Sequence, residues 1–298
     1  MSVGNLQAGW AATSGGRGAR SASRRPRAVA LRWVVAILLL AISALTIFPL
    51  VWLVLTSIRP ANTVFGGSFF PSSVTLHAYA TAWSSTDFGT HFLNSLMVTV
   101  STVIGVVILA TLAGYAFATL RFPFKNVIYV ALLVTLMMPS TSLIIPLYLQ
   151  LKSFGLLNSR VGLVVLYVSS SAPFAMFLMR AFFETLPHEL VQAARIDTAG
   201  EFQIFLRVIL PLTRPGLATV VIFQFLSTWN EFIYANTVLQ NTGRLPLQPV
   251  LFSLVGQYQT DWPTLCAGLT MSIVPVVAVY VWMQRHFVSG MTMGAVKN

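Results

Sequence analysis

The sequence predicts an all-α, polytopic membrane protein with six transmembrane helices. Of its 298 residues, 56% are hydrophobic and only 8% are charged, whereas an average soluble domain carries about 25% charged residues. The mean hydropathy of +0.78 agrees with this composition. Long stretches without any ionisable residue separate the few charges. These observations argue against a water-soluble enzyme, because too little polar surface remains to dissolve a chain of this size.

The N-terminal residues 1–32 are rich in Gly, Ser, Ala and Arg and show no apolar period. We therefore expect a disordered, basic cytoplasmic tail there. A membrane domain over residues 33–285 and a cytoplasmic C-terminal tail over residues 286–298 should follow. The net charge of +11 would suit a nucleic-acid partner. Most of the excess charge flanks membrane helices, however, so we expect membrane lipid and no nucleic acid as a partner.

The apolar stretches give the expected helices. A helix that crosses about 30 Å of hydrocarbon needs roughly 20 mostly apolar residues, because each residue rises about 1.5 Å. Five uncharged stretches meet this length, and a sixth is apolar except for Glu231. In chain order, the six helices are expected within residues 33–55, 92–120, 126–151, 161–179, 215–236 and 262–284.

The positive residues set the expected orientation. With the N-terminus in the cytoplasm, the inner segments hold 14 Lys and Arg residues and the outer segments hold 4. The outer cations are Arg59, Lys152, Arg160 and Arg244. Because cytoplasmic loops of membrane proteins carry an excess of Lys and Arg, we expect both termini in the cytoplasm.

Three connecting segments are long enough to have a structure of their own. Two are expected outside, at residues 56–91 and 237–261. The third, at residues 184–214, is expected in the cytoplasm and holds four of the seven acidic residues. This concentration of polar residues makes the cytoplasmic segment a candidate for contact with a partner.

The cytoplasmic segment predicts two short amphipathic helices joined by a turn at residues 197–200. The first helix places Ala193 and Ala194 on one face, where small side chains permit the close approach of another surface. The second repeats apolar residues with the spacing of a helix, at Phe202, Phe205, Leu206 and Ile209. The pair is either a docking device for a partner or two helices that lie on the lipid surface.

Motifs for catalysis and metal binding are incomplete. His188-Glu189 begins a helical zinc-protease motif, but Gln192 stands where a second His must complete the metal site. The one cysteine, Cys266, excludes an intrachain disulfide and a thiolate metal cluster. The sequence also lacks the Gly-Lys-Ser/Thr signature of a phosphate-binding loop. We therefore expect no catalytic residue, metal or cofactor on this chain. Any energy-driven process in which the chain takes part must then draw its energy from a partner or from an ion gradient.

Asn230 and Glu231 are polar residues within the fifth expected helix. An ionisable group in hydrocarbon costs about 2.5–3.5 kcal/mol on insertion scales, so it usually faces a cavity or a partner. The two residues are therefore candidates for the polar lining of a translocation pathway. A hydrogen bond from Glu231 to another helix explains its position equally well.

The cytoplasmic segment also carries a motif. Residues 189–199 read ELVQAARIDTA, and Phe202 and the pattern LPLxxP at residues 210–215 follow. This segment resembles the EAA loop of binding-protein-dependent ABC importer permeases. Trp229-Asn230-Glu231-Phe232 and the tail Gly290–Lys297 are similar to carbohydrate permeases of the type of the maltose system's smaller membrane subunit. The resemblance covers roughly residues 45–298.

The resemblance implies the fold of a type I ABC importer permease and contacts with ATPase subunits. The implied coupling residues are Glu189, Gln192, Ala193, Ala194, Asp197, Thr198, Ala199, Gly200 and Phe202. The implied contacts of the C-terminal tail are Gly294, Ala295, Val296 and Lys297. The family usually has Glu in place of Gln192 and Gly in place of Thr198. Because a β-branched residue resists the positive φ that Gly permits, this departure favours a turn shifted onto Gly200.

The resemblance finally implies a function. The chain would form half of a pathway for a di- or oligosaccharide, beside a second, homologous permease, and an extracytoplasmic solute-binding protein would deliver the sugar. Two partner ATPase subunits would use ATP and Mg, so the chain itself would be a transport subunit and not an enzyme. Its expected location is the plasma membrane of a bacterium. The alternatives are a permease for glycerol-3-phosphate or a polyol, a secondary transporter and a membrane enzyme.

Overall fold

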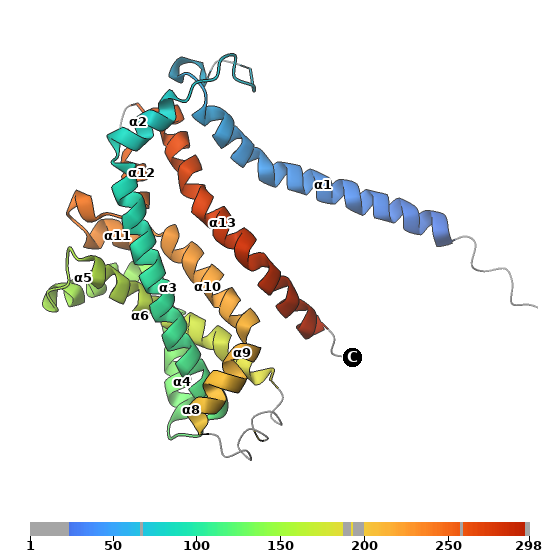
Figure 1. Cartoon of the computed structure of the whole chain (residues 1–298), viewed down its shortest axis with the longest axis vertical. Coiled ribbons are helices and arrows are strands. Elements are labelled where there is room, and N and C mark those ends of the chain that lie inside the picture. Colours follow the sequence, from blue (N-terminus) through green and yellow to red (C-terminus); the bar gives the residue numbers. More distant parts are fainter. Residues whose placement is uncertain (1–23, 66–67, 187–191, 193–199, 257–258, 296–298) are drawn as a thin grey trace, which may run out of the picture. The chain divides into compact units, whose positions relative to one another are not determined.

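The computed structural model describes residues 24–65, 68–186, 192, 200–256 and 259–295. Every regular element in these ranges is a helix, as the composition predicts. The chain divides into two compact units, residues 1–52 and residues 53–298. Helix α1 (Arg24–Ser57) begins in the first unit and ends in the second, which holds all the later elements (Figure 1).

The second unit combines long membrane helices with short helices in the connections (Figure 1). Its longer helices are α2 (His77–Ser85), α3 (Phe88–Thr119), α4 (Lys125–Thr135), α5 (Ile144–Ser153), α6 (Arg160–Glu184), α10 (Arg214–Trp229), α11 (Ile233–Val238), α12 (Leu247–Ser253) and α13 (Trp262–Ala295). Its shorter helical segments are η1 (Ala61–Thr63), η2 (Ser140–Leu143), α8 (Glu201–Ile204), the π-helical η3 (Phe205–Ile209), α9 (Leu210–Leu212) and η4 (Thr242–Arg244).

Four helices of the described chain are long and apolar enough to cross a membrane alone: Leu31–Ser57, Phe88–Thr119, Arg160–Glu184 and Trp262–Gln284. Two further pairs reach this length only together. The pair α4 and η2–α5 is bent by 97°, and the pair of residues 202–212 and α10 is bent by 76°. The described residues therefore give six spans only if each bent pair crosses once.

The expectation of one unbroken helix over each of residues 126–151 and 215–236 is wrong, because the structure breaks both ranges. In the first, α4 ends at Thr135, and Pro139, which has no backbone N–H to donate, directly precedes η2. In the second, α10 ends at Trp229 and α11 begins at Ile233. The side chain of Glu231 accounts for this second break, as its hydrogen bonds show below.

Helices α3 and α6 form the most extensive helix pair of the second unit. At Gly114 of α3, an added Cβ would lie 2.9 Å from the Cβ of Met179 and 3.0 Å from the backbone nitrogen of Arg180. Glycine is therefore what lets the two backbones approach so closely, as small residues do in membrane helix pairs. Helix α10 packs on α3 and α13, and α13 packs on α2 (Figure 1).

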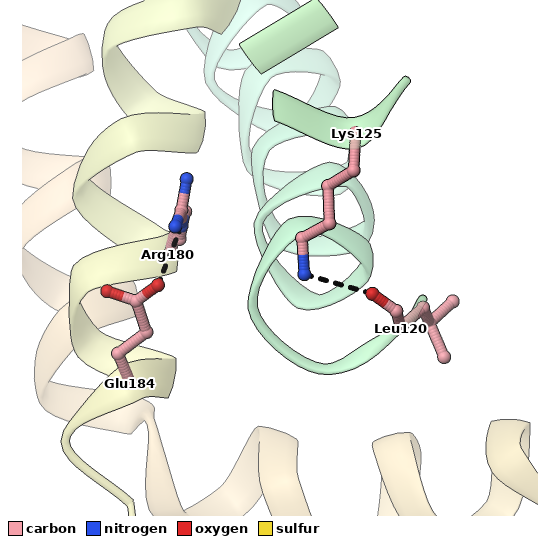
Figure 2. A network of polar contacts seen from close by, with 4 residues as sticks. All are labelled: Leu120, Lys125, Arg180 and Glu184. Atoms are coloured by element: carbon pink, nitrogen blue, oxygen red, sulfur yellow. Dashed lines mark hydrogen bonds and ion pairs between the residues drawn. The ribbon is translucent and has the colours of Figure 1, made fainter. Parts of the chain in front are cut away.

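Positive side chains gather where α3 and α6 end. Figure 2 shows that Lys125 donates to the carbonyl of Leu120 (2.9 Å) and that Arg180 donates to Glu184 (2.7 Å). The Arg180 guanidinium also lies 3.9 Å from the centroid of the Tyr129 ring. These cations are among those that the charge pattern predicts on the cytoplasmic side.

Two of the cations predicted on the outer side lie where α6 begins. Arg160 donates to the carbonyl of Gly243 (3.4 Å), and Arg244 donates to the carbonyl of Asn158. Arg160 and Arg180 are 20 residues apart in one helix, which corresponds to about 30 Å along its axis. The helix thus separates the two sets of charges by about the thickness of the hydrocarbon layer.

The connection between α11 and α12, residues 239–246, is held against the start of α3. His91 Nδ1 donates to the carbonyl of Leu245 at 2.8 Å, and Asn94 Nδ2 lies 3.0 Å from the carbonyls of Gly243 and Leu245. Asn158 binds the same connection from the start of α6. With a positive φ of 54°, it accepts the backbone N–H of Gln240 (3.2 Å) and of Asn241 (3.0 Å) on Oδ1. This loop therefore has a fixed shape.

The second helix predicted within residues 184–214 is present as α8, η3 and α9, but its buried face differs from the expected one. Phe205 is 5% exposed and packs against Tyr115 of α3, whose ring also contacts Phe183 of α6. Ile209 is buried in the same cluster. Phe202 is 66% exposed and Leu206 is exposed as well. The π-helical turn has more residues per turn than an α-helix, so a pattern with strict α-helical spacing does not give the face correctly.

Candidate functional site

A polar hollow of about 270 Å³ lies between α6, α10, α11 and the η2–α5 segment. Most of its lining side chains carry a hydroxyl, an amide or a carboxylate group. They are Ser140, Thr141, Tyr167, Ser170, Ser171, Gln224, Ser227, Thr228, Glu231 and Tyr234, with Ile144 and Ile233 as apolar neighbours.

The hollow is deep in the membrane domain. Tyr167 and Ser171 follow the first residue of α6, Arg160, by 7 and 11 residues. At about 1.5 Å per residue, they lie about 10 Å and 16 Å along the helix. A bilayer core is about 30 Å thick, so these groups reach its middle. Polar groups at that depth need partners from the protein or from a water-filled cavity.

Glu231 starts a new helix in the middle of this region. Its Oε1 accepts the backbone N–H of Tyr234 at 2.7 Å, and its Oε2 accepts the backbone N–H of Ala235 at 3.1 Å. A carboxylate in this position satisfies N–H groups that a helix start leaves free and is stabilised by the positive end of the helix. Glu231 also accepts the hydroxyl of Tyr167 from α6. These contacts explain why the chain breaks between α10 and α11.

Several other polar groups of the hollow are hydrogen-bonded within the protein and keep free acceptor capacity. The Tyr234 hydroxyl donates to the carbonyl of Ser140 at 2.7 Å, and Gln224 donates to the hydroxyl of Thr228 at 2.8 Å. Ser170 donates to the carbonyl of Tyr167 at 3.2 Å. A hydroxyl that donates one bond can still accept two. The hollow can therefore accept hydrogen bonds from a solute rich in O–H groups.

The two candidate pathway residues are placed differently. Glu231 lines the hollow, and it also makes the interhelical hydrogen bond to Tyr167 that was the alternative interpretation. Asn230 is exposed and is not among the residues that line the hollow. Its side-chain amide donates to the carbonyl of Leu226 at 2.9 Å. The sequence analysis missed Tyr167 and Tyr234. A possible signal was the run Ser169–Ser171 within an otherwise apolar stretch.

Most of the implied coupling residues lie outside the described residues. Those are Glu189, Ala193, Ala194, Asp197, Thr198 and Ala199, together with Val296 and Lys297 of the tail. Gln192, Gly200 and Phe202 are described, and all three are exposed. Gly294 and Ala295 belong to the end of α13. The implied roles of these residues stay predictions.

In the part of the chain that the structure describes, no group of three or more His, Cys, Asp or Glu side chains could hold a metal ion. Cys266 is a buried thiol on α13. The polar hollow is thus the site with the clearest chemical character among the described residues.

Comparison with known proteins agrees with the membrane architecture. Residues 107–293 match the family described as binding-protein-dependent transport system inner membrane component. A solved chain of a bacterial ABC transporter involved in the import of the acidic polysaccharide alginate has a TM-score of 0.77 and 26% identity. The alignment covers 91% of this chain and 100% of that chain.

Two curated relatives are similar along nearly their whole length. The permease protein of a diacetylchitobiose uptake system from Streptomyces coelicolor is 35% identical, over 93% of this chain and 91% of that protein. The permease protein of a trehalose transport system from Mycobacterium tuberculosis is 32% identical, over 85% and 93% of the two chains. The chain therefore belongs to the family of binding-protein-dependent transport system inner membrane components, the membrane-spanning permease subunits of ABC importers.

Proposed function

We propose that this chain forms half of the membrane pathway through which an ATP-driven importer moves a di- or oligosaccharide. The observation that carries the proposal is the hydroxyl-rich hollow between α6, α10 and α11. Sugars present many O–H groups, which both donate and accept hydrogen bonds, and the serine and threonine hydroxyls of the hollow match them. The two curated relatives are named for the disaccharides diacetylchitobiose and trehalose, which supports the same class of substrate.

The proposed importer contains a second permease, two ATPase subunits that use ATP and Mg, and an extracytoplasmic solute-binding protein. Both termini lie in the cytoplasm. The end of α6 that carries Arg180 then faces the cytoplasm, and the end that carries Arg160 faces outward. The excess of Lys and Arg predicted inside supports this orientation.

The cytoplasmic segment at residues 184–214 is the proposed coupling element. Phe205 of this segment packs on Tyr115 of α3 and belongs to one buried cluster with Phe183 of α6. A partner that moves the segment therefore moves side chains packed on the central helix pair. Packed interfaces shift between discrete arrangements rather than deforming continuously, which suits a two-state pump.

Sugar uptake in a deletion strain tests the proposal. Loss of this chain should abolish the uptake of at least one labelled disaccharide, with diacetylchitobiose and trehalose as the first two to measure. The intact chain should restore that uptake when it is supplied from a plasmid. The uptake of labelled glycerol-3-phosphate and of a polyol in the same cells serves as the control. A specific loss of one of these two solutes, with all sugars unaffected, would overturn the proposal in favour of the alternative permease.

A further inference from the structure

Among the described residues, the lining of the polar hollow contains an acidic side chain, Glu231, and no basic side chain. We propose that Glu231 makes the hollow a charge filter, which admits neutral or cationic hydroxyl-rich solutes and rejects anionic ones such as uronic-acid sugars and sugar phosphates. This inference rests on the proposed function and narrows the class of sugar that the same site accepts.

The lining residues carry one carboxylate and no counterion. Glu231 is the acidic member of the described lining, and none of the other described lining residues is Lys, Arg or His. The ion pair formed among the described residues, Arg180–Glu184, lies near the end of α6 and away from the hollow. A solute in the hollow therefore meets a negative group with no basic side chain to offset it.

The hydrogen bonds to Glu231 stabilise its carboxylate without cancelling its charge. All three donors are neutral groups, namely the hydroxyl of Tyr167 and the backbone N–H groups of Tyr234 and Ala235. A helix start contributes at most about half an elementary positive charge, and α11 has only six residues. With Glu231 ionised, the hollow therefore has a net negative charge.

The expected discrimination is large. Two like charges about 7 Å apart, at an effective dielectric constant of about 20, repel each other enough to weaken binding roughly 50-fold. Sites that bind phosphate or carboxylate groups normally supply Arg or Lys for bidentate or point-charge contacts. The hollow offers neither, so it suits a neutral or amino sugar better than glycerol-3-phosphate or an acidic polysaccharide.

Charged thiol reagents measure this property without any sugar. The substitution Ser171→Cys, in a Cys266→Ala background, places a thiol in the wall of the hollow. Membrane vesicles that contain the assembled transporter are treated on both sides with a trimethylammonium-bearing and a sulfonate-bearing methanethiosulfonate. The measured quantity is the ratio of the reaction rate with the cationic reagent to that with the anionic reagent. We expect this ratio at position 171 to be at least tenfold higher than the same ratio for a small free thiol in solution. Adding Glu231→Gln should reduce this extra preference to about threefold or less.

Two controls separate charge from structure. Tyr167→Phe removes the hydroxyl that donates to Glu231 but leaves the carboxylate, so the reagent preference should stay at its original value. A thiol introduced by Asn241→Cys, in the 239–246 loop, should not respond to Glu231→Gln. An unchanged preference in the Glu231→Gln variant would overturn the charge filter, as would an equal change in Tyr167→Phe.

An introduced thiol at position 171 that reacts with neither reagent would also overturn the inference, because the hollow would then be closed to solutes. The outcomes remain distinct from those of the uptake experiment. A transporter that imports sugars but shows no charge preference retains the proposed function and loses the filter. A charge preference in a chain that restores no sugar uptake leaves the filter standing and removes the proposed function.

Discussion

At the scale of single residues, Glu231 joins three parts of the membrane domain. It ends the irregular stretch after α10, begins α11, and binds α6 through Tyr167. The site therefore depends on the oxygen atoms of one side chain for its shape and on its charge for its electrostatics. Substitutions that separate these two properties are the most informative.

We expect Glu231→Gln to assemble and Glu231→Leu to fail. Glutamine keeps an oxygen that can accept the N–H of Tyr234, whereas leucine leaves the three donors without an acceptor. Each buried group left unpaired costs about 1–3 kcal/mol. The amount of chain that co-purifies with its partner permease should therefore drop several-fold for leucine alone. Uptake should fall for both, and normal transport by the glutamine variant would show that the charge is dispensable for transport.

Asn158 makes a second prediction at this scale. Its Oδ1 accepts two backbone N–H groups of the 239–246 loop, and its φ is 54°. Asn158→Ala removes the acceptor and places alanine in a conformation that costs about 1–2 kcal/mol. Hydrogen exchange at Gln240 and Asn241 should accelerate about tenfold or more. In Asn158→Asp, which keeps the acceptor, these two amides should exchange at nearly the original rate. In Asn158→Gly, which relieves the backbone strain but lacks the acceptor, their exchange should be as fast as in the alanine variant.

At the scale of elements, the close approach of α3 and α6 sets the stability of the second unit. A Cβ at Gly114 would meet the backbone of α6 at Arg180, and the backbone cannot rotate away. Gly114→Ala should therefore destabilise the detergent-solubilised protein by about 1–3 kcal/mol and lower its melting temperature. Gly89→Ala in the same helix is the matched control, because its nearest contact would be an ordinary 3.6 Å to Trp83. Equal melting temperatures for both variants would contradict the tight packing.

Hydropathy and charge predict the elements well and their interruptions poorly. Pro49, Pro173 and Pro275 lie inside continuous helices, whereas α4 ends before Pro139. Local sequence cannot distinguish these cases, because packing against neighbouring helices decides whether a proline is tolerated. The sequence could not predict the hollow either, because Tyr167 and Glu231, which meet in it, are 64 residues apart in the chain. Glu231 itself was found because a charge in an apolar stretch is conspicuous without any structure.

At the scale of the whole molecule, the orientation of the chain can be measured directly. Two variants each carry one introduced cysteine, Asn241→Cys or His188→Cys, in a Cys266→Ala background. The first position is predicted outside the cell and the second in the cytoplasm. An impermeant thiol reagent applied to intact cells should label the variant at position 241 and spare the one at position 188. Permeabilised cells should give labelling of both. The reverse pattern in intact cells would invert the topology.

Coupling to a partner ATPase is the second property of the whole assembly. Ala194→Trp should leave the chain inserted and paired with its partner permease, but abolish coupled uptake or detach the ATPase. The reason is that a closely packed interface tolerates added volume poorly. His188→Trp, expected on another face of the same predicted helix, should be milder. If the helices lie on lipid instead, tryptophan at position 194 is well tolerated, and uptake and ATPase co-purification both stay normal.

The break between α4 and η2 turns part of the wall of the hollow into main chain. The carbonyl of Ser140, which accepts the Tyr234 hydroxyl at 2.7 Å, belongs to the backbone, and no substitution at residue 140 can delete it. A lineage that changes its sugar can therefore alter the neighbouring serine and threonine side chains one at a time while this acceptor stays in place. Divergence of the pathway should therefore proceed through its hydroxyls.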